Sequence, residues 1–205
     1  MDRTQRYVAL GDSYTIGQGV TESGRWPMQL AASLRADGLP VEDPRIVART
    51  GWTVAELDAS MDTESLEPPY DLVTLLIGVN DQYRSGAVDT YRTELRAMLG
   101  RAVGLADAQP RRVVLVSIPD WGVTSFAQKD VRGPAAIGAQ IDAFNTVARE
   151  EARRAGVAFV DITDLSRSPA HRAQLVDDGL HPSAAQYRAW AMRIAPAART
   201  ALESP

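Results

Sequence analysis

Residues 71–77, Asp-Leu-Val-Thr-Leu-Leu-Ile, decide the fold, because this largely apolar run is almost uninterrupted and ends at Gly78. A strand with one face in water alternates apolar and polar residues, whereas a strand covered on both faces reads as a continuous apolar run. The stretch is therefore predicted to be a buried strand of a parallel sheet.

Four further runs of the same character surround it along the chain. They are residues 7–10, 45–48, 113–118 and 157–161. Apolar residues at helical spacing fill the gaps between runs, within 28–34, 88–102 and 141–152, and a last such segment follows at 187–198. Strands that alternate with helices over short connections predict a three-layer α/β/α sandwich around a five-stranded parallel sheet.

The chain is expected to form one domain over residues 1–205, since no linker or internal repeat divides it. The exception to short connections is the segment 120–138, which is expected to be a loop over the functional site. Met1–Tyr7 contains no signal-peptide core, and no apolar run approaches the length of a membrane span. We therefore expect a cytoplasmic protein, although a mature secreted form would look the same.

The amino-acid composition argues against several classes of function. A net charge of −4 argues against nucleic acid as a partner. The absence of cysteine excludes thiol nucleophiles and thiolate metal sites, and no metal is expected. Lys129 is the only lysine, which disfavours a P-loop or a Schiff-base enzyme.

Polar residues follow the predicted strands on one edge of the sheet. Ser13 follows the first strand, Gly51 the second and Asn80 the third, while Asp178 and His181 come after the fifth. Ligands of open α/β sheets bind outside the carboxyl ends of the strands. The sequence therefore predicts a site at this edge.

The chemistry of these residues points to acyl transfer. Ser13 supplies a nucleophile, His181 a base, and Asp178, three residues upstream, a carboxylate to orient the base. The second histidine, His171, is most simply a solvent-facing residue, and Asp177 is not expected to take part. The resulting hypothesis is a serine esterase.

The segments that carry these residues resemble the four blocks of the SGNH hydrolases, also called the GDSL esterases and lipases. They are Gly11-Asp12-Ser13, Gly51, Gly78-Val79-Asn80-Asp81 and Asp178-x-x-His181, in that order over residues 11–181. The resemblance implies a flavodoxin-like fold and hydrolysis of a small-molecule ester, with no cofactor. It also implies an oxyanion hole made by the backbone N–H groups of Ser13 and Gly51 and the side-chain amide of Asn80.

Residues beside the blocks are candidates for substrate binding. Tyr14 stands where many family members have leucine, and it is expected to affect substrate preference. Trp52 and Trp121, each near a strand end, are predicted to line an acyl pocket. The small size of the chain leaves little room for a lid and favours short acyl groups.

Other interpretations remain open at this point. Ser13 or Asn80 could cap a helix and Gly51 could be only a turn residue. Asp12 and Asp81 are expected to brace their loops. Thioesterase, lysophospholipase or sugar O-acetyl esterase activity would use the same residues. A non-catalytic, flavodoxin-like binding domain would leave the Asp178/His181 pair without a role. The sequence does not predict an oligomeric state.

Overall fold

A computed structural model describes residues 3–203, apart from the side chain of His171, so the solvent-facing position expected for that residue lies outside the described part. All five predicted strands form and pair in parallel in one sheet, in the order β2-β1-β3-β4-β5. This is the flavodoxin-like order, and the predicted fold class is confirmed. The strands are β1 (Tyr7–Gly11), β2 (Arg45–Ala48), β3 (Leu72–Leu76), β4 (Val113–Val116) and β5 (Ala158–Val160).

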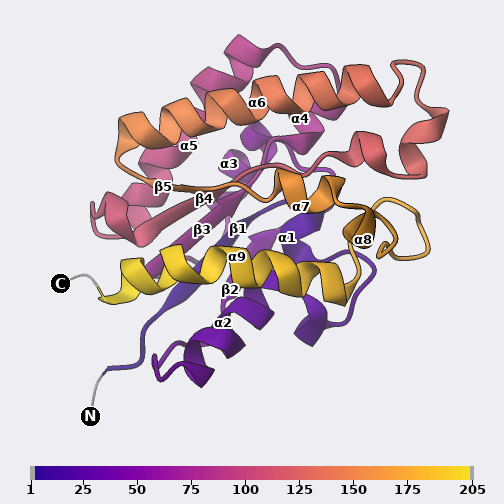
Figure 1. The fold of residues 1–205 in the computed structure, drawn as a ribbon. Coiled ribbons are helices and arrows are strands. Elements are labelled where there is room, and N and C mark those ends of the chain that lie inside the picture. The colour runs from indigo at the N-terminus through magenta and orange to yellow at the C-terminus, as the bar shows by residue number, and fades with distance from the viewer. Residues whose placement is uncertain (1–2, 204–205) are drawn as a thin grey trace.

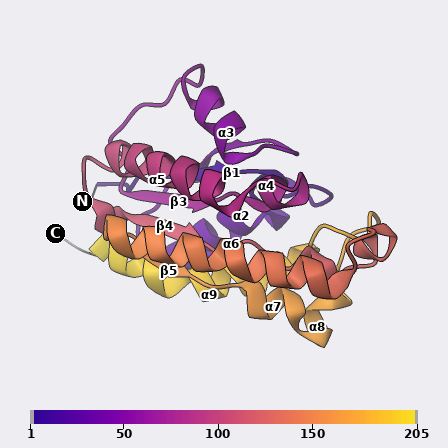
Figure 2. The same ribbon diagram turned by 90° about the horizontal axis from the view of Figure 1, so that it is seen from above.

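Helices cover both faces of the sheet (Figures 1 and 2). On one face lie α2 (Trp26–Ala36) and α9 (Ala184–Glu203), which pack against each other. On the other lie α3 (Val54–Met61), α5 (Val88–Leu105) and α6 (Pro134–Ala155). Short helices occupy the connections: α1 (Ser13–Ile16), α4 (Val79–Tyr83), α7 (Thr163–Arg167) and α8 (Pro169–Arg172).

The topology follows from the handedness of the crossovers. The chain passes from β1 to β2 through α2 on one face, and from β2 through β3 and β4 to β5 by way of α3, α5 and α6 on the other. Right-handed crossovers on opposite faces run in opposite directions along the sheet. The direction changes beside β1, and this change opens a crevice at the carboxyl ends of β1 and β3.

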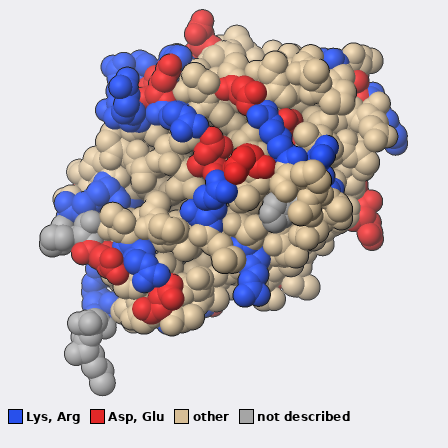
Figure 3. Space-filling view, in the orientation of Figure 1, with Lys and Arg blue, Asp and Glu red and all other residues tan. Residues whose placement is uncertain are grey.

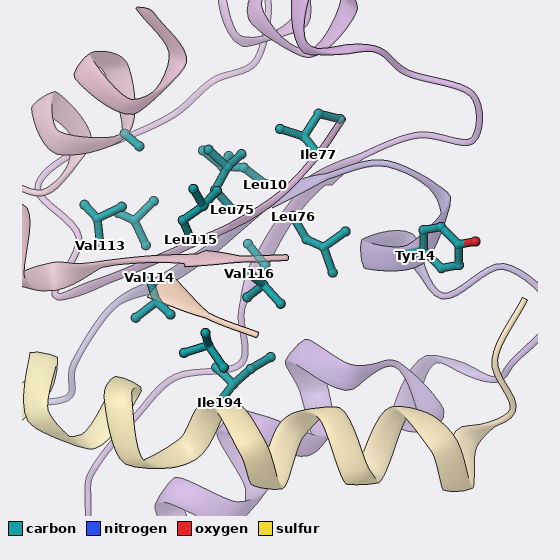
Figure 4. Packing of buried hydrophobic residues seen from close by; sticks show 14 of the residues in the cluster. Leu10, Tyr14, Leu75, Leu76, Ile77, Val113, Val114, Leu115, Val116 and Ile194 are labelled. Carbon is teal, nitrogen blue, oxygen red and sulfur yellow. The ribbon is translucent and has the colours of Figure 1, made fainter. Parts of the chain in front are cut away.

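The core explains why the strands read as continuous apolar runs. In Figure 4, Leu75 and Leu115 lie on one side of the sheet, while Val114 lies on the other side, toward Ile194 of α9. All four side chains are buried. Successive residues of a strand point to opposite faces, so apolar residues are needed at every position when both faces are covered.

The segment 120–138 is more ordered than the expected loop. It contains 3₁₀ turns at Trp121–Val123 and Phe126–Lys129, and α6 already begins at Pro134. The side chain of Asp120 starts the first turn by accepting a hydrogen bond from the Gly122 N–H. Proline suits the first turn of a helix because its missing N–H would have no intrahelical partner there. The connection is therefore shorter than the sequence predicted.

Charged side chains of both signs are intermixed on the face shown in Figure 3. Several form ion pairs, such as Arg149 with Asp161 and Arg193 with Asp164. Within residues 3–203, no helix is long and apolar enough to cross a membrane.

Candidate active site

The sheet gathers the predicted site residues at the carboxyl ends of its strands. Ser13 is the second residue after β1, Gly51 follows β2, and Asn80 follows β3. Asp178 and His181 lie beyond β5, in the connection from α8 to α9. In the described structure, four of these five residues line one pocket: Ser13, Gly51, Asn80 and His181. The fifth, Asp178, lies behind His181 and contacts its ring.

Ser13, His181 and Asp178 form a continuous chain of hydrogen bonds. The Nε2 atom of His181 lies 2.9 Å from Ser13 Oγ, and its Nδ1 atom lies 2.6 Å from Asp178 Oδ2. Ser13 and His181 are 5% and 4% exposed, so little water competes for their hydrogen bonds. This is the geometry required of a nucleophile, a general base and an orienting carboxylate.

The loop around Asp178 holds its carboxylate in place. The second oxygen, Oδ1, accepts hydrogen bonds from the backbone N–H groups of Leu180 and His181, at 2.8 and 2.9 Å. Partial burial opposes ionisation, but these N–H groups and the His181 ring outweigh it and lower the pKa of Asp178 below its ordinary value. The carboxylate is therefore ionised at neutral pH, as an acceptor for Nδ1–H must be. Asp177, its neighbour, is exposed to solvent.

His181 is also supported by an aromatic ring. Tyr14 is 3% exposed, and its ring centroid lies 5.4 Å from that of His181. On its other side Tyr14 contacts Trp190 of α9, with ring centroids 5.9 Å apart. The residue that departs from the family pattern therefore lines the pocket and packs against the histidine ring.

The neighbouring Asp12 caps the helix that begins at Ser13. Its Oδ1 atom accepts a hydrogen bond from the Tyr14 N–H at 3.0 Å, so the capping role considered for Ser13 belongs to Asp12. Asp12 is fully buried. Burial is the main cause that raises its pKa to about 8, and the nearby charge of Asp81 adds to the increase.

A neutral, buried Asp12 has a consequence for stability. Because folding raises the pKa of Asp12 from about 4 to about 8, the folded protein binds more protons than the unfolded chain between these values. The free energy of unfolding should therefore fall as pH rises through this interval, by up to about 1.4 kcal/mol per pH unit. Asp12→Asn cannot ionise, so its melting temperature relative to wild type should rise between about pH 4 and about pH 8.

The exposed Asp177 provides the matched control, since Asp177→Asn changes a carboxylate that folding leaves in water. Thermal unfolding followed by circular dichroism would measure both variants. A constant difference between Asp12→Asn and wild type across the pH range would contradict a neutral Asp12.

Gly51 and Asn80 line the same pocket as Ser13 and His181. Gly51 has a φ of +88°, in the left-handed region that favours glycine. Asn80 lies within α4 rather than at its cap, and its Nδ2 atom donates to the carbonyl oxygen of Trp52 at 2.9 Å. An amide nitrogen carries two hydrogens, so one N–H of Asn80 is left for a second acceptor. The Asn80 side chain therefore does not cap this helix.

The pocket has a volume of about 150 Å³. Its lining is mainly apolar and consists of Ser13, Tyr14, Thr50, Gly51, Val79, Asn80, Tyr83, Trp121, Phe126, Leu180 and His181. Tyr14 and Trp121 are among these residues, and their role in substrate binding stays a prediction. Trp52 is not among the described residues that line it: its side chain is half-buried and packs against the core. Trp52 contributes its backbone carbonyl instead.

Three aromatic rings form one wall of the pocket. Trp121 lies 5.3 Å from Tyr83 and 6.1 Å from Phe126 between ring centroids. Trp121 is fixed by a hydrogen bond of 2.7 Å from its Nε1 atom to Gln82 Oε1, whereas Tyr83 and Phe126 are 45% and 39% exposed. Tyr83 is a pocket residue that the sequence did not suggest. Its position three residues after Asn80, on the same short helix, was the available signal.

Asp81 braces the neighbouring loop, as expected. Its carboxylate accepts a hydrogen bond from the Val54 N–H, with the closer oxygen at 3.2 Å. Among the residues that the structure describes, no cluster of three or more histidine, cysteine, aspartate and glutamate side chains could hold a metal ion.

Similar structures share this fold. TesA has a TM-score of 0.75 and 23% identity, and the match covers 97% of this chain and 100% of TesA. A lipase/acylhydrolase from Enterococcus faecalis has a TM-score of 0.73 and 22% identity over 94% of each chain. Axe2, an acetylxylan esterase from Geobacillus stearothermophilus, has a TM-score of 0.67 and 21% identity, over 98% of this chain and 95% of Axe2.

The sequence matches no curated protein. The model of the GDSL-like lipase/acylhydrolase family matches residues 9–189, which include all four sequence blocks. The chain therefore belongs to the GDSL-like lipase/acylhydrolase family of ester hydrolases, as its sequence blocks predicted.

Proposed function

We propose that the protein hydrolyses carboxylic esters with short acyl groups through an acyl-enzyme formed on Ser13. The observation that carries this proposal is the hydrogen-bonded chain from Ser13 Oγ through His181 to Asp178, at the base of an apolar pocket. A binding domain without catalytic activity would have no use for a serine, a histidine and a carboxylate in this order.

In the first half of the reaction, Ser13 Oγ attacks the acyl carbonyl carbon while His181 Nε2 takes the hydroxyl proton. Asp178 accepts a hydrogen bond from His181 Nδ1–H, which fixes the tautomer of the ring, and it stabilises the imidazolium that forms. The negative charge on the carbonyl oxygen is held by the N–H groups of Ser13 and Gly51 and by the free amide N–H of Asn80. The imidazolium then gives its proton to the leaving alcohol, and the ester C–O bond breaks.

In the second half, water replaces the alcohol. His181 removes a proton from this water as it attacks the acyl-enzyme, and the same donors hold the oxyanion. Collapse of the second tetrahedral intermediate returns the proton to Ser13 Oγ and releases the carboxylic acid. The chain's own residues supply each proton transfer.

The pocket supports a short acyl group. A cavity of similar volume holds one benzene molecule, which is about six carbon atoms. The lining is mainly apolar, so it suits a hydrocarbon rather than a charged group. The similarity to Axe2, an acetylxylan esterase, is compatible with a small acyl group.

A series of p-nitrophenyl esters with acyl chains of two to about twelve carbons tests this size limit. We expect kcat/KM to be greatest at or below about six carbons and to fall for longer chains, because additional methylenes find no apolar surface inside the pocket. Steady-state kinetics of the released nitrophenolate provides the measurement.

Val79 offers a matched pair of variants for the same series, since it lines the pocket and is 5% exposed. Val79→Ala should move the preferred acyl group toward longer chains, and Val79→Leu toward shorter ones. A preference for long chains in wild type, or an unchanged preference in both variants, would contradict this assignment of the acyl group to the pocket.

Asn80→Ala tests the proposed oxyanion hole. The variant should lower kcat by roughly 10²- to 10³-fold with little change in KM, because the amide is needed mainly when charge develops on the oxygen. Kinetics on a short-chain ester and a melting temperature should be measured together. A loss confined to thermal stability would mean that Asn80 only supports the Trp52 loop.

Thioesters, lysophospholipids and acetylated sugars are alternative substrates for the same residues. Of these, the small pocket favours the acetylated sugar over an ester of a long fatty acid. Hydrolysis rates for an acetylated sugar and a long-chain lysophospholipid, measured side by side, would separate these two.

A further inference from the structure

Gly51 needs support from its surroundings if its N–H is to hold an oxyanion. Its φ of +88° requires glycine, and glycine is also the residue whose backbone rotates most freely. Preorganised donors stabilise a developing charge because they do not have to reorient during the reaction. A freely rotating glycine would lose that advantage.

Side chains from α4, from the residue that caps it and from the loop after α1 contact the segment around Gly51. Arg84 Nη2 donates to the Gly51 carbonyl oxygen at 2.6 Å, and Asn80 holds the next carbonyl, that of Trp52. On the preceding side, the Thr50 hydroxyl donates to Gln18 Oε1 at 2.6 Å. The peptide group that follows Gly51 and the side chain of the preceding Thr50 are therefore both hydrogen-bonded to neighbours.

Arg84 is itself held in position. Its Nη1 atom lies 3.2 Å from both carboxylate oxygens of Glu56. Glu56 belongs to the capping box of α3, in which its side chain accepts from the Thr53 N–H at 2.8 Å. The guanidinium thus connects the carbonyl of Gly51 to the first turn of the helix that follows it.

The ion pair between Arg84 and Glu56 contributes little to the stability of the fold. The side chains of Arg84 and Glu56 are 51% and 45% exposed, and exposed ion pairs contribute little because water and salt screen them. The contact with the Gly51 carbonyl is a shorter, charge-assisted hydrogen bond, and it acts on the backbone of the proposed oxyanion hole.

We propose that Arg84 is a positioning residue: by holding the Gly51 carbonyl it restricts backbone rotation at this glycine, so that the Gly51 N–H stays directed at the oxyanion. This inference rests on the proposed function, because it concerns the oxyanion hole of the same site. Arg84 acts through the backbone of Gly51 and makes no contact with the substrate in this account.

Two substitutions of Arg84 separate the hydrogen bond from the charge. Arg84→Met keeps an unbranched side chain and removes both, whereas Arg84→Gln removes the charge and keeps an N–H donor. We expect Arg84→Met to lower kcat about tenfold and to leave KM within about twofold, because the lost interaction matters in the transition state. Arg84→Gln should retain more of kcat than Arg84→Met.

A boronic acid inhibitor with a short alkyl chain gives a second readout, since it forms a tetrahedral adduct on the serine with an oxygen in the oxyanion hole. Its affinity should weaken by about the same factor as kcat in Arg84→Met. Arg45→Met is the matched control, because Arg45 is 50% exposed and forms an ion pair of 2.7 Å with Glu64. The control should leave kcat and inhibitor affinity unchanged.

The outcomes distinguish this inference from the proposed function. A wild-type protein without ester hydrolysis would overturn the proposed function. If the wild type is active but Arg84→Met and Arg45→Met have the same kcat and the same inhibitor affinity, only the role of Arg84 is overturned. An increase in KM at constant kcat in Arg84→Met would also overturn it.

Discussion

Ser13→Ala is expected to abolish ester hydrolysis while leaving the fold intact. The loss in kcat should be on the order of 10⁴-fold or more, since the variant lacks the hydroxyl that lies 2.9 Å from His181 Nε2. The substitution removes one oxygen from a side chain that caps nothing, because Asp12 caps α1. Hydrolysis of a short-chain p-nitrophenyl ester and a far-ultraviolet circular dichroism spectrum would measure activity and fold together.

The control for this variant is Ser23→Ala, which removes the hydroxyl of an exposed serine away from the pocket. It should retain wild-type activity. Substantial hydrolysis by correctly folded Ser13→Ala would mean that another residue is the nucleophile.

The second large effect is expected at Asp178. Asp178→Asn should lower kcat by up to about 10⁴-fold, because an amide that donates to Nδ1 favours the wrong imidazole tautomer. The neighbouring carboxylate is a matched control: Asp178 Oδ2 lies 2.6 Å from Nδ1, and Asp177 is an adjacent aspartate that is likewise exposed. Asp177→Asn should therefore stay within about tenfold of wild type.

Both variants should be measured at the same pH on the same ester. A larger loss in Asp177→Asn would mean that the orienting carboxylate is misassigned. Two mild effects would mean that Ser13 and His181 work as a pair, with the backbone around residue 178 holding the ring.

The sheet could be predicted from the sequence because burial on both faces leaves a direct signal. Residues 71–77 contain β3, Leu72–Leu76, and each of the other four apolar runs overlaps a strand. Two helices were harder to identify. The helix α3 carries the capping box of Thr53 and Glu56, a signal that the sequence analysis did not use, and α4 spans only Val79–Tyr83, too short for periodicity to be evident.

The functional edge could be predicted for a related reason. In a parallel sheet the carboxyl ends of all strands meet, so residues that follow different strands become neighbours whatever their separation in sequence. Ser13 and His181 lie 168 residues apart and are within 2.9 Å. The order of the strands was not needed for this inference.

The supporting contacts could not be predicted in the same way. That Asn80 holds the Trp52 carbonyl, and Arg84 that of Gly51, depends on how α4 approaches the loop after β2. Side-chain reach and backbone direction decide such contacts, and neither leaves a periodic trace in the sequence. The same reason explains why Trp52, near a strand end, packs against the core and is not among the described residues that line the pocket.

Labelling with a fluorophosphonate probe tests the central claim most directly, because the probe reacts with an activated serine and its site can be mapped by mass spectrometry of peptides. The account predicts one modified residue, Ser13, in wild type, no labelling of Ser13→Ala, and much slower labelling of His181→Ala. Modification at another residue, or an unreactive Ser13 in correctly folded wild type, would contradict the assignment of Ser13 as a nucleophile activated by His181.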